Sequence, residues 1–292
     1  MDTAASSLSI SPAELRPLLG RPGAPLVLDV RRPPRFAESD RLLPGARHCP
    51  PEHVQRFAES ERPQEVVVYC VYGHEVGQQA AQTLRQAGWN ARFLAGGIEG
   101  GEPGVDAADD LQRWRAVPPV AIRKRPDLGV TGERPSRWIT RERPKIDRVA
   151  CPWLVRRFID PRAEFFYVPT DQVFSEAERI GAVPYDIPGA PISHEWERCS
   201  FDALLRAFEL KDPALDTLAT IVRGADTARF SIAPQAAGLL AVSLGLSRLH
   251  PQDDHAMLGA AMTVYDALFA WCAEAQGETH TWWRAHPEGA PA

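Results

Sequence analysis

The sequence predicts an α/β protein in which a parallel sheet flanked by helices is followed by a mostly helical α+β domain. Over roughly the first 110 residues, short β-branched runs alternate with helical patterns, which is typical of a parallel sheet with right-handed crossovers. A Gly- and Pro-rich break at residues 100–104 ends this alternation. Beyond residue 200 the apolar residues recur mainly at helical spacing.

The first predicted element is a short helix after Ser11, which is followed by Pro12 and Glu14 in the spacing of a capping box. The other elements of this half are strands at residues 26–30, 65–69 and 91–94, a turn into a short strand at residues 43–48, and a helix at residues 75–87 that ends before Gly88. The strands at residues 26–30 and 65–69 are mostly apolar, as expected for parallel strands that are buried on both faces.

Five prolines between Arg113 and Arg148 exclude a regular core element from this segment. We therefore expect a linker that wraps over a surface, with its Pro- and Arg-rich part at residues 116–135. After it the sequence predicts a strand at residues 164–168 and helices at residues 204–210, 214–222, 235–246 and 254–272. The residues after Gly277 are expected to be frayed.

The overall composition is that of a globular protein of 292 residues, 44% hydrophobic and 24% charged, with a formal net charge of −5. This balance excludes a fully disordered chain and a protein that binds nucleic acid through bulk positive charge. The charge is uneven, because the segment from Arg113 to Arg148 carries a net +7 and the remainder −12. We expect this basic segment to dock on acidic surfaces or to attract a small oxyanion. Its prolines oppose a recognition helix, so nucleic acid is not expected as a partner.

The chain has no run of about 18 apolar residues and no secretory signal at its first residues. Its five cysteines, at positions 49, 70, 151, 199 and 272, form an odd and sparse set without a CxxC pair. Such a set fits free thiols in a reducing compartment. We therefore expect a cytoplasmic location and no membrane partner.

Cys70 gives the sharpest local signal for chemistry, because it directly follows the predicted strand at residues 65–69 and precedes the predicted helix at residues 75–87. Ligands of α/β folds bind at the carboxyl ends of parallel strands. The free amides and the dipole of a helix N-terminus stabilise an anion, so we expect a lowered pKa for the Cys70 thiol. Gly73 lets the loop curl its amides around the sulfur. These residues alone leave open the alternative of a buried structural cysteine.

Residues 10–115 resemble a rhodanese domain in four motifs that occur in the family's order. These are Leu28-Asp29-Val30-Arg31, Leu43-Pro44-Gly45-Ala46-Arg47-His48, Cys70-Val71-Tyr72-Gly73-His74-Glu75 and Phe93-Leu94-Ala95-Gly96-Gly97. The resemblance implies a sulfurtransferase in which Cys70 is the catalytic residue. It would take sulfane sulfur from a small donor, carry it as a persulfide and pass it to a thiol acceptor.

The resemblance also assigns roles around Cys70. Val71, Tyr72, Gly73, His74 and Glu75 would form the loop that cradles the persulfide. Asp29 and Arg31 would support this loop rather than contact substrate, and His74 is expected to be exposed rather than catalytic. A cysteine phosphatase would need Arg at position 76 to hold a phosphate, where this chain has Val76. The acidic Glu75 would repel thiosulfate, so the donor, thiosulfate or a persulfide, stays open.

Residues 136–277 resemble the C-terminal domain of chromate-resistance (ChrB-type) proteins. The resemblance rests on the runs at residues 138–154, 156–160, 197–202, 221–226 and 253–258. Relatives that act as chromate-sensing regulators carry another N-terminal domain, so a regulator role is not transferred to this chain.

Two groups of polar residues in the second half are candidate sites. Lys145, Arg148, Cys151 and Arg223, with Arg156 and Arg157 nearby in the sequence, could bind a divalent oxyanion such as chromate. The alternative is a solvated basic face, and for Cys151 a buried thiol. His194, Glu197 and Cys199, with Asp226 or His255, have the donor atoms of a metal site, but such residues also cap helices. We therefore assign no metal ligand and no cofactor.

The sequence thus predicts a sulfurtransferase domain fused to a chromate-resistance domain. The rival hypothesis is a non-catalytic sensor that binds chromate or another oxyanion, or that responds to redox state through a thiol. If the basic cluster or His194 faced the Cys70 loop, the two halves would form one composite site; otherwise they would carry two separate functions.

Overall fold

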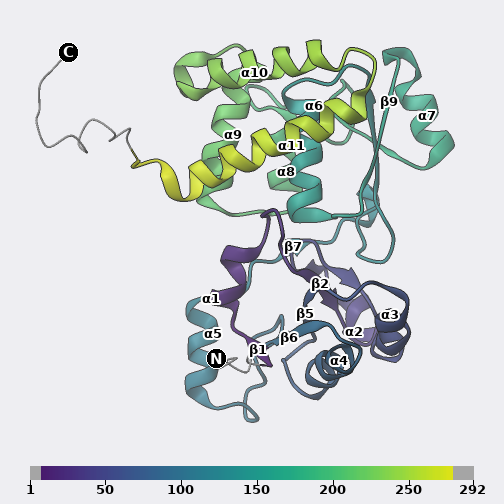
Figure 1. The fold of residues 1–292 in the computed structure, drawn as a ribbon, viewed down its shortest axis with the longest axis vertical. Helices are drawn as coiled ribbons and strands as arrows, with labels where there is room; N and C mark the ends of the chain where they lie inside the picture. The colour runs from purple at the N-terminus through teal and green to yellow at the C-terminus, as the bar shows by residue number, and fades with distance from the viewer. Residues whose placement is uncertain (1–7, 279–292) are drawn as a thin grey trace, which may run out of the picture.

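A five-stranded parallel sheet forms the centre of the first half in the computed structural model, which describes residues 8–278. The strand order is β1 (Ser9–Ile10), β6 (Asn90–Leu94), β5 (Glu65–Tyr69), β2 (Leu26–Asp29) and β4 (Arg47–His48). Every neighbouring pair in this sheet is parallel. This sheet lies in the lower half of the molecule in Figure 1. The boundaries of its three longer strands, β2, β5 and β6, lie within one residue of the predicted ones.

Helices flank this sheet. They are α1 (Pro12–Leu15), α2 (Pro33–Glu38), α3 (Val54–Ser60), α4 (Glu75–Gln86) and α5 (Ala108–Ala116). The capping box predicted at Ser11 is confirmed, since its hydroxyl accepts from the Glu14 amide while the Glu14 carboxylate accepts from the Ser11 amide. The helices α2, α3 and α5 were not predicted, because they are too short to show a clear helical period.

The linker joins the two halves by a strand. β7 (Ile122–Arg123) pairs antiparallel with β3 (Arg41–Leu42) of the first half. On its other side, the Arg123 amide donates to the Phe208 carbonyl at 3.0 Å. Arg41 and Arg123 both form ion pairs with Glu209 of the second half. The basic segment thus docks, in part, on an acidic residue, as its charge predicted.

A three-stranded parallel sheet lies at the edge of the second half. Its order is β10 (Val183–Pro184), β8 (Arg137–Arg141) and β9 (Glu164–Val168). The strand β9 has the predicted boundaries, whereas β8 and the helix α7 (Val173–Ile180) were not predicted. A small apolar cluster around Ile139 and Val173 holds α7 against this sheet.

The remaining helices build the core of the second half (Figure 1). They are α6 (Asp147–Leu154), α8 (Ser200–Ala207), α9 (Pro213–Asp226), α10 (Gln235–Leu249) and α11 (Asp254–Ala270), and π-helical turns at Val155–Ile159 and Trp271–Ala275 extend α6 and α11. The predicted fold class, an α/β half followed by a mostly helical α+β half, is confirmed.

Pro152 lies inside α6, although a proline commonly stands at the start of a helix. A proline cannot donate to the carbonyl four residues earlier, here that of Arg148. The Tyr185 hydroxyl donates to this carbonyl instead, at 3.1 Å. A neighbouring side chain thus satisfies the acceptor that the proline leaves open, and the helix continues.

The two halves share one apolar core. The ring of Phe158, in the π-helical turn that extends α6, packs on Gly20 of the first half, where a Cβ would lie 2.0 Å from the ring. Gly20 also has a φ of +73°, so contact and backbone both require glycine. This packing fixes the orientation of α6 relative to the first sheet.

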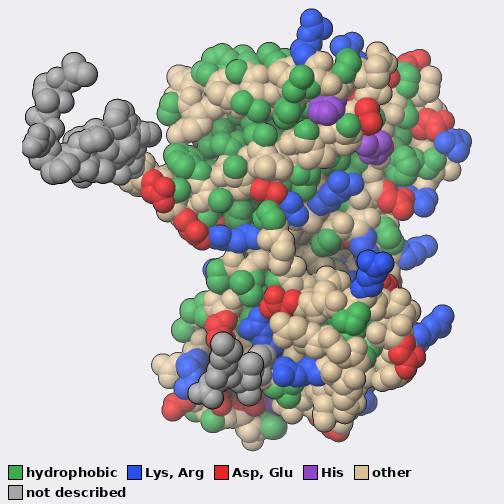
Figure 2. All heavy atoms as spheres, in the orientation of Figure 1, with side chains coloured by type: hydrophobic (Ala, Val, Ile, Leu, Met, Phe, Trp, Pro, Cys, Tyr) green, Lys and Arg blue, Asp and Glu red, His purple; other side chains and the backbone are tan. Residues whose placement is uncertain are grey.

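The segment Asp254–Ala275 is, among the described residues, one helix that is long and apolar enough to cross a membrane. In this fold one third of its apolar window is buried, and it packs on the core through Met257, Ala261, Tyr265 and Phe269. Figure 2 shows hydrophobic side chains gathered over α10 and α11, and Val242, Leu244 and Leu249 of α10 are exposed.

All five cysteines are buried and free. The expectation of unpaired thiols is therefore confirmed, and Cys49 and Cys272 pack in the core. Trp282 and Trp283, in the part of the tail expected to be frayed, lie outside the described residues.

Candidate functional site

Cys70 lies at the carboxyl end of β5, in the middle of the first sheet. Its side chain is largely buried, and the Gly73 amide donates to its Sγ at 3.3 Å. The loop can turn back on the sulfur because Gly73 has a φ of +77°. A Cβ at Gly73 would lie 2.6 Å from the Gly96 nitrogen, so this glycine is required by both conformation and space.

The segment after β6 holds the Cys70 loop from the outside. The Ile98 amide donates to the Cys70 carbonyl at 3.1 Å, and the Glu99 amide donates to the Val71 carbonyl at 2.9 Å. The residues that directly follow the motif at Gly96 and Gly97 therefore hold the Cys70 loop through the backbone.

The side chains of Asp29 and Arg31 support this end of the sheet from below. Both are almost fully buried, and the Arg31 guanidinium donates to both carboxylate oxygens of Asp29, with Nη2–Oδ2 at 2.6 Å. The Tyr69 hydroxyl donates to the same Oδ2 at 2.8 Å, and burial keeps this phenol protonated by raising its pKa well above the usual value. Since Tyr69 directly precedes Cys70, this network fixes the end of β5.

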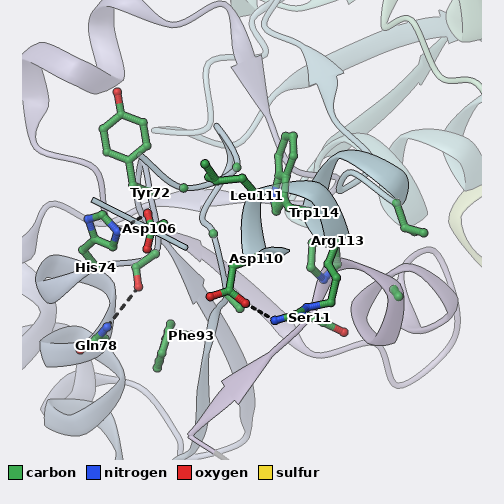
Figure 3. Close-up of a pocket in the computed structure, with 18 residues that line it drawn as sticks. Ser11, Tyr72, His74, Gln78, Phe93, Asp106, Asp110, Leu111, Arg113 and Trp114 are labelled. Carbon is green, nitrogen blue, oxygen red and sulfur yellow. Dashed lines mark hydrogen bonds and ion pairs between the residues drawn. The ribbon is translucent and has the colours of Figure 1, made fainter. Parts of the chain in front are cut away.

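A pocket of about 450 Å³ opens beside the Cys70 loop. Figure 3 shows Tyr72, His74 and Gln78 on one side of it and Leu111 and Trp114 of α5 across from them. Phe93 of β6 lines it too, and the carboxylates of Asp106 and Asp110 lie at its edge. The pocket thus combines an apolar, aromatic interior with acidic groups.

His74 is tied into this pocket wall rather than free in solvent. Its Nε2 lies 2.7 Å from Oδ2 of Asp106 (Figure 3), and its side chain is 35% exposed. The same oxygen accepts from the Glu102 amide at 2.6 Å, and this bond, followed by that to His74, lowers the pKa of Asp106. The contact between His74 and Asp106 holds the loop at residues 102–106 against the start of α4.

Trp114 anchors the wall that α5 supplies. A Cβ at Gly96 or Gly100 would lie 2.7 or 2.4 Å from the indole ring, and the indole Nε1 donates to the Gly97 carbonyl at 3.2 Å. The sequence motif at Gly96 and Gly97 pointed to the loop, but the contact with Trp114 was missed. The sequence signal that could have indicated this contact is a tryptophan within an otherwise polar segment.

Glu75 is the first residue of α4 and is exposed. Its Oε1 accepts from the Gln79 side chain at 2.8 Å, one turn further along the helix. The carboxylate thus stays on the exposed surface of α4, directly after the Cys70 loop.

In the second half, His194 meets three carboxylates. Its Nε2 lies 3.4 Å from Oδ2 of Asp147, 3.2 Å from Oδ1 of Asp186 and 3.2 Å from Oδ2 of Asp226. These contacts raise the pKa of His194 to about 12, with Asp147 contributing most. Burial raises the pKa of Asp147 to about 6.

Of the residues considered as metal ligands, the structure brings His194 and Asp226 together and directs the others elsewhere. Glu197 pairs with Arg229, at 3.0 Å. Cys199 caps α8, with its thiol 3.4 Å from Oδ2 of Asp202, and the His255 ring contacts Tyr167.

Sequence reasoning missed Asp147 and Asp186 as members of this group. Asp186 has a φ of +52°, a left-handed conformation that Asp adopts more readily than most residues. Ile146, before Asp147, has a φ of +42°, which is strained for a β-branched residue. The Tyr265 hydroxyl holds it by donating to its carbonyl at 3.0 Å.

The predicted oxyanion ligands lie among carboxylates and carbonyls. Arg148 contacts Asp186 and the carbonyl of Glu142, while Arg223 lies 3.2 Å from Asp202. Lys145 is half-buried before α6. Cys151 is fully buried with its thiol 3.7 Å from Asp147, and burial raises its pKa well above the usual value.

Arg156 and Arg157 also have partners. The Arg156 guanidinium lies 5.1 Å from the centre of the Phe165 ring, and Arg157 pairs with Asp266 at 2.7 Å. The basic residues of this region thus mainly hold the second half together.

The Cys70 loop and the His194 cluster are separate. Asp147 begins α6, and Phe158 contacts the first half at the other end of the same helical run. At 1.5 Å per residue these ends are about 16 Å apart. The contacts given for the Cys70 loop come from the first half itself. The two halves therefore carry two separate candidate sites.

Comparison with known families assigns each half. The family model of the rhodanese-like domain matches residues 11–102, and that of the ChrB C-terminal domain matches residues 138–272. The chain joins a rhodanese-like domain to a ChrB C-terminal domain. It is 35% identical over 151 residues to the protein ChrB of Cupriavidus metallidurans, a match that covers 48% of this chain and 45% of that protein. The chain thus matches less than half of the length of this relative.

Solved structures resemble the rhodanese-like domain. A rhodanese homologue from Thermus thermophilus is 32% identical, with 32% of this chain and 99% of that chain covered and a TM-score of 0.26. A rhodanese-like domain from Anabaena is 27% identical, with 39% of this chain and 78% of that chain covered and a TM-score of 0.30.

Proposed function

We propose that the rhodanese-like domain is a sulfurtransferase that carries sulfane sulfur on Cys70. The Cys70 thiolate attacks the outer sulfur of a donor, so that a new S–S bond forms on Cys70. The donor's own bond to that sulfur breaks, and the rest of the donor leaves as an anion, sulfite from thiosulfate or a thiolate from a persulfide. A thiolate acceptor then attacks the outer sulfur of the Cys70 persulfide. This attack forms the acceptor persulfide and returns the Cys70 thiolate.

The observation that carries this proposal is the bond from the Gly73 amide to Sγ of Cys70, at 3.3 Å. Backbone amides that point at a sulfur stabilise negative charge on it. The position of Cys70 between β5 and α4 adds the N-terminus of a helix to the same site.

The pocket beside the loop favours an organic persulfide over thiosulfate as the donor. Its interior offers the rings of Tyr72, Phe93 and Trp114 for apolar contact. Asp106 and Asp110 also line the pocket, and the lining residue Arg113 is paired with Asp110, so a small dianion finds little free positive charge there. A persulfide with an apolar or aromatic body would bury that body in the pocket.

The test is to load the full chain with sulfur and locate it. The protein is incubated with thiosulfate or with a low-molecular-weight persulfide, and intact and peptide masses are measured. We expect one added sulfur atom on Cys70, none in Cys70→Ser, and unchanged loading in Cys49→Ser, which removes a buried cysteine elsewhere. If no donor loads Cys70, the domain is a non-catalytic member of its superfamily.

We further propose that the whole protein serves chromate resistance in the cytoplasm. The ChrB C-terminal domain supports the first part, and the five free cysteines fit a reducing compartment. A deletion strain is complemented with the wild type or with Cys70→Ser, and growth on chromate is compared. Complementation by Cys70→Ser would favour the rival hypothesis of a non-catalytic sensor.

A further inference from the structure

The cluster around His194 gathers side chains from four separate segments near the start of α6. Asp147 begins α6, Asp186 lies after β10, His194 lies in the loop before α8, and Asp226 ends α9. We propose that these four side chains bind one divalent transition-metal ion. This inference goes beyond the sulfur chemistry of Cys70 and does not depend on it.

Three carboxylates converge on one nitrogen of His194. Its Nε2 lies within 3.2–3.4 Å of an oxygen from each of Asp147, Asp186 and Asp226. Without an ion, a protonated imidazole pairs with these carboxylates, and its one Nε2 hydrogen is shared among three acceptors. A metal ion in the place of this hydrogen would bond to each ligand directly.

A metal ion accounts for all three contacts together. In a four-coordinate site with bonds of about 2.0–2.1 Å, neighbouring ligand atoms lie about 3.3 Å apart. The nitrogen-to-oxygen distances in this cluster are 3.2, 3.2 and 3.4 Å. Ligand atoms of Asp147, Asp186 and His194 also lie within 4.8 Å of one another, as ligands of a single ion do. Asp226 is outside this group of three but contacts His194 at 3.2 Å, and its carboxylate would complete the set by turning towards the ion.

Outer contacts orient the two buried carboxylates so that each turns one oxygen towards His194. For Asp147 this oxygen is Oδ2, while Oδ1 accepts from the Phe201 amide at 3.0 Å. For Asp186 it is Oδ1, while Arg141 and Arg148 lie 3.2 and 3.5 Å from Oδ2. Metal-binding carboxylates are commonly held by such outer contacts.

Ser200 at the start of α8 completes the support. Its amide donates to Oδ2 of Asp147 at 2.5 Å, and its hydroxyl donates to Oδ1 of Asp186 at 2.8 Å. Each of these oxygens keeps a second lone pair for an ion.

The ion would reach the cluster from the surface. The Asp147 side chain is fully buried, whereas the side chains of Asp226 and His194 are 20% and 41% exposed. Two ligands thus form a fixed floor and two form an accessible rim.

One imidazole and three carboxylates select among metals. Carboxylates favour Mn²⁺ and Mg²⁺, while imidazole favours Zn²⁺, Fe²⁺ and Cu²⁺. The nearby thiols are turned away from His194, since Cys151 contacts Oδ1 of Asp147 and Cys199 faces Asp202. The mixed set fits Mn²⁺, Fe²⁺ or Zn²⁺, and we use Mn²⁺ and Zn²⁺ as probes.

The experiment is a calorimetric titration of untagged full-length protein after treatment with EDTA. We expect one equivalent of Mn²⁺ or Zn²⁺ to bind per chain. His194→Gln and Asp226→Asn should each weaken binding at least tenfold, because each removes a ligand at the exposed rim. Glu197→Gln is the matched control, since Glu197 is near in sequence but pairs with Arg229, and it should bind as the wild type does.

Thermal unfolding gives a second readout. The metal should raise the melting temperature of the wild type and of Glu197→Gln, but not that of His194→Gln or Asp226→Asn. Melting curves without metal check that each variant folds. The proposal is wrong if the wild type binds neither ion, or if His194→Gln and Asp226→Asn bind as tightly as the wild type.

Discussion

A Cβ on Gly77 would lie 3.2 Å from the Sγ of Cys70. Gly77 is in the first turn of α4, and its lack of a side chain leaves room around the sulfur. A persulfide needs more room than a thiol. A side chain at position 77 would therefore limit whether Cys70 can carry the second sulfur atom.

Gly77→Val should therefore block persulfide formation while the domain stays folded. We expect at least a tenfold lower loading rate on Cys70, measured by mass spectrometry under the proposed sulfurtransferase reaction. Gly259→Val is the control, because Gly259 is also helical and a Cβ there meets nothing within 4 Å. Equal loading in the two variants would contradict the role of Gly77.

Gly73→Ala should destabilise the fold and move the amide that binds the sulfur. A Cβ there would lie 2.6 Å from the Gly96 nitrogen, and the φ of +77° is unfavourable for alanine. We expect a loss of more than about 2 kcal/mol in the free energy of unfolding. Gly23→Ala has a similar φ of +76° but open space, so it should cost only about 1 kcal/mol. Urea unfolding of both variants separates the close contact from the backbone strain.

Trp114→Ala should open the pocket beside the Cys70 loop. The indole ring packs on Gly96 and Gly100 and anchors α5. Loss of this wall should raise KM for an aromatic persulfide about tenfold, which corresponds to about 1.4 kcal/mol of lost contact. Trp196→Ala is the control, since Trp196 is fully exposed. An unchanged KM in Trp114→Ala would show that the donor does not use this pocket.

Arg31→Ala should leave the buried carboxylate of Asp29 without its cation. Breaking a buried pair in this way costs about 3–5 kcal/mol, and we expect a loss of this size in urea unfolding. Arg35→Ala removes a pair with Glu38 that is mostly exposed, so it should cost less than about 1 kcal/mol. A small effect of Arg31→Ala would mean that Asp29 finds another partner or is protonated.

Alkylation should distinguish Cys70 from the other cysteines. Burial raises the pKa of Cys49 and of Cys272 to about 11, and it raises the pKa of Cys151 and of Cys199 further. A thiol whose pKa is raised stays protonated, and unreactive, until the pH approaches that value. Iodoacetamide at neutral pH should therefore label Cys70 first, and labelling of Cys49 and Cys272 should rise as the pH approaches 11. Peptide mapping that found Cys151 labelled before Cys70 would contradict this assignment.

Much of the first site could be predicted because its parts are close in sequence. The strand β5, the loop from Cys70 to Glu75 and the helix α4 follow one another directly, and each has a local signature. The loop motif gave the position of Gly73, whose amide binds the sulfur. The wall formed by Trp114 could not be predicted, because it depends on where a short helix packs.

The helix α6 shows a limit of local rules. Proline usually marks a helix boundary, yet Pro152 lies within α6 because Tyr185, from a distant loop, donates to the carbonyl of Arg148. Only the tertiary contact replaces the missing hydrogen bond.

The sequence by itself determined the two domains and the placement of Cys70 between a strand and a helix, since periodicity and adjacent motifs encode both. The tertiary structure alone decided the partners of His194. Asp147, Asp186 and Asp226 are 47, 8 and 32 residues away from it along the chain. No local pattern links such positions, and they meet because the packing of α6, α8 and α9 turns their side chains to one point.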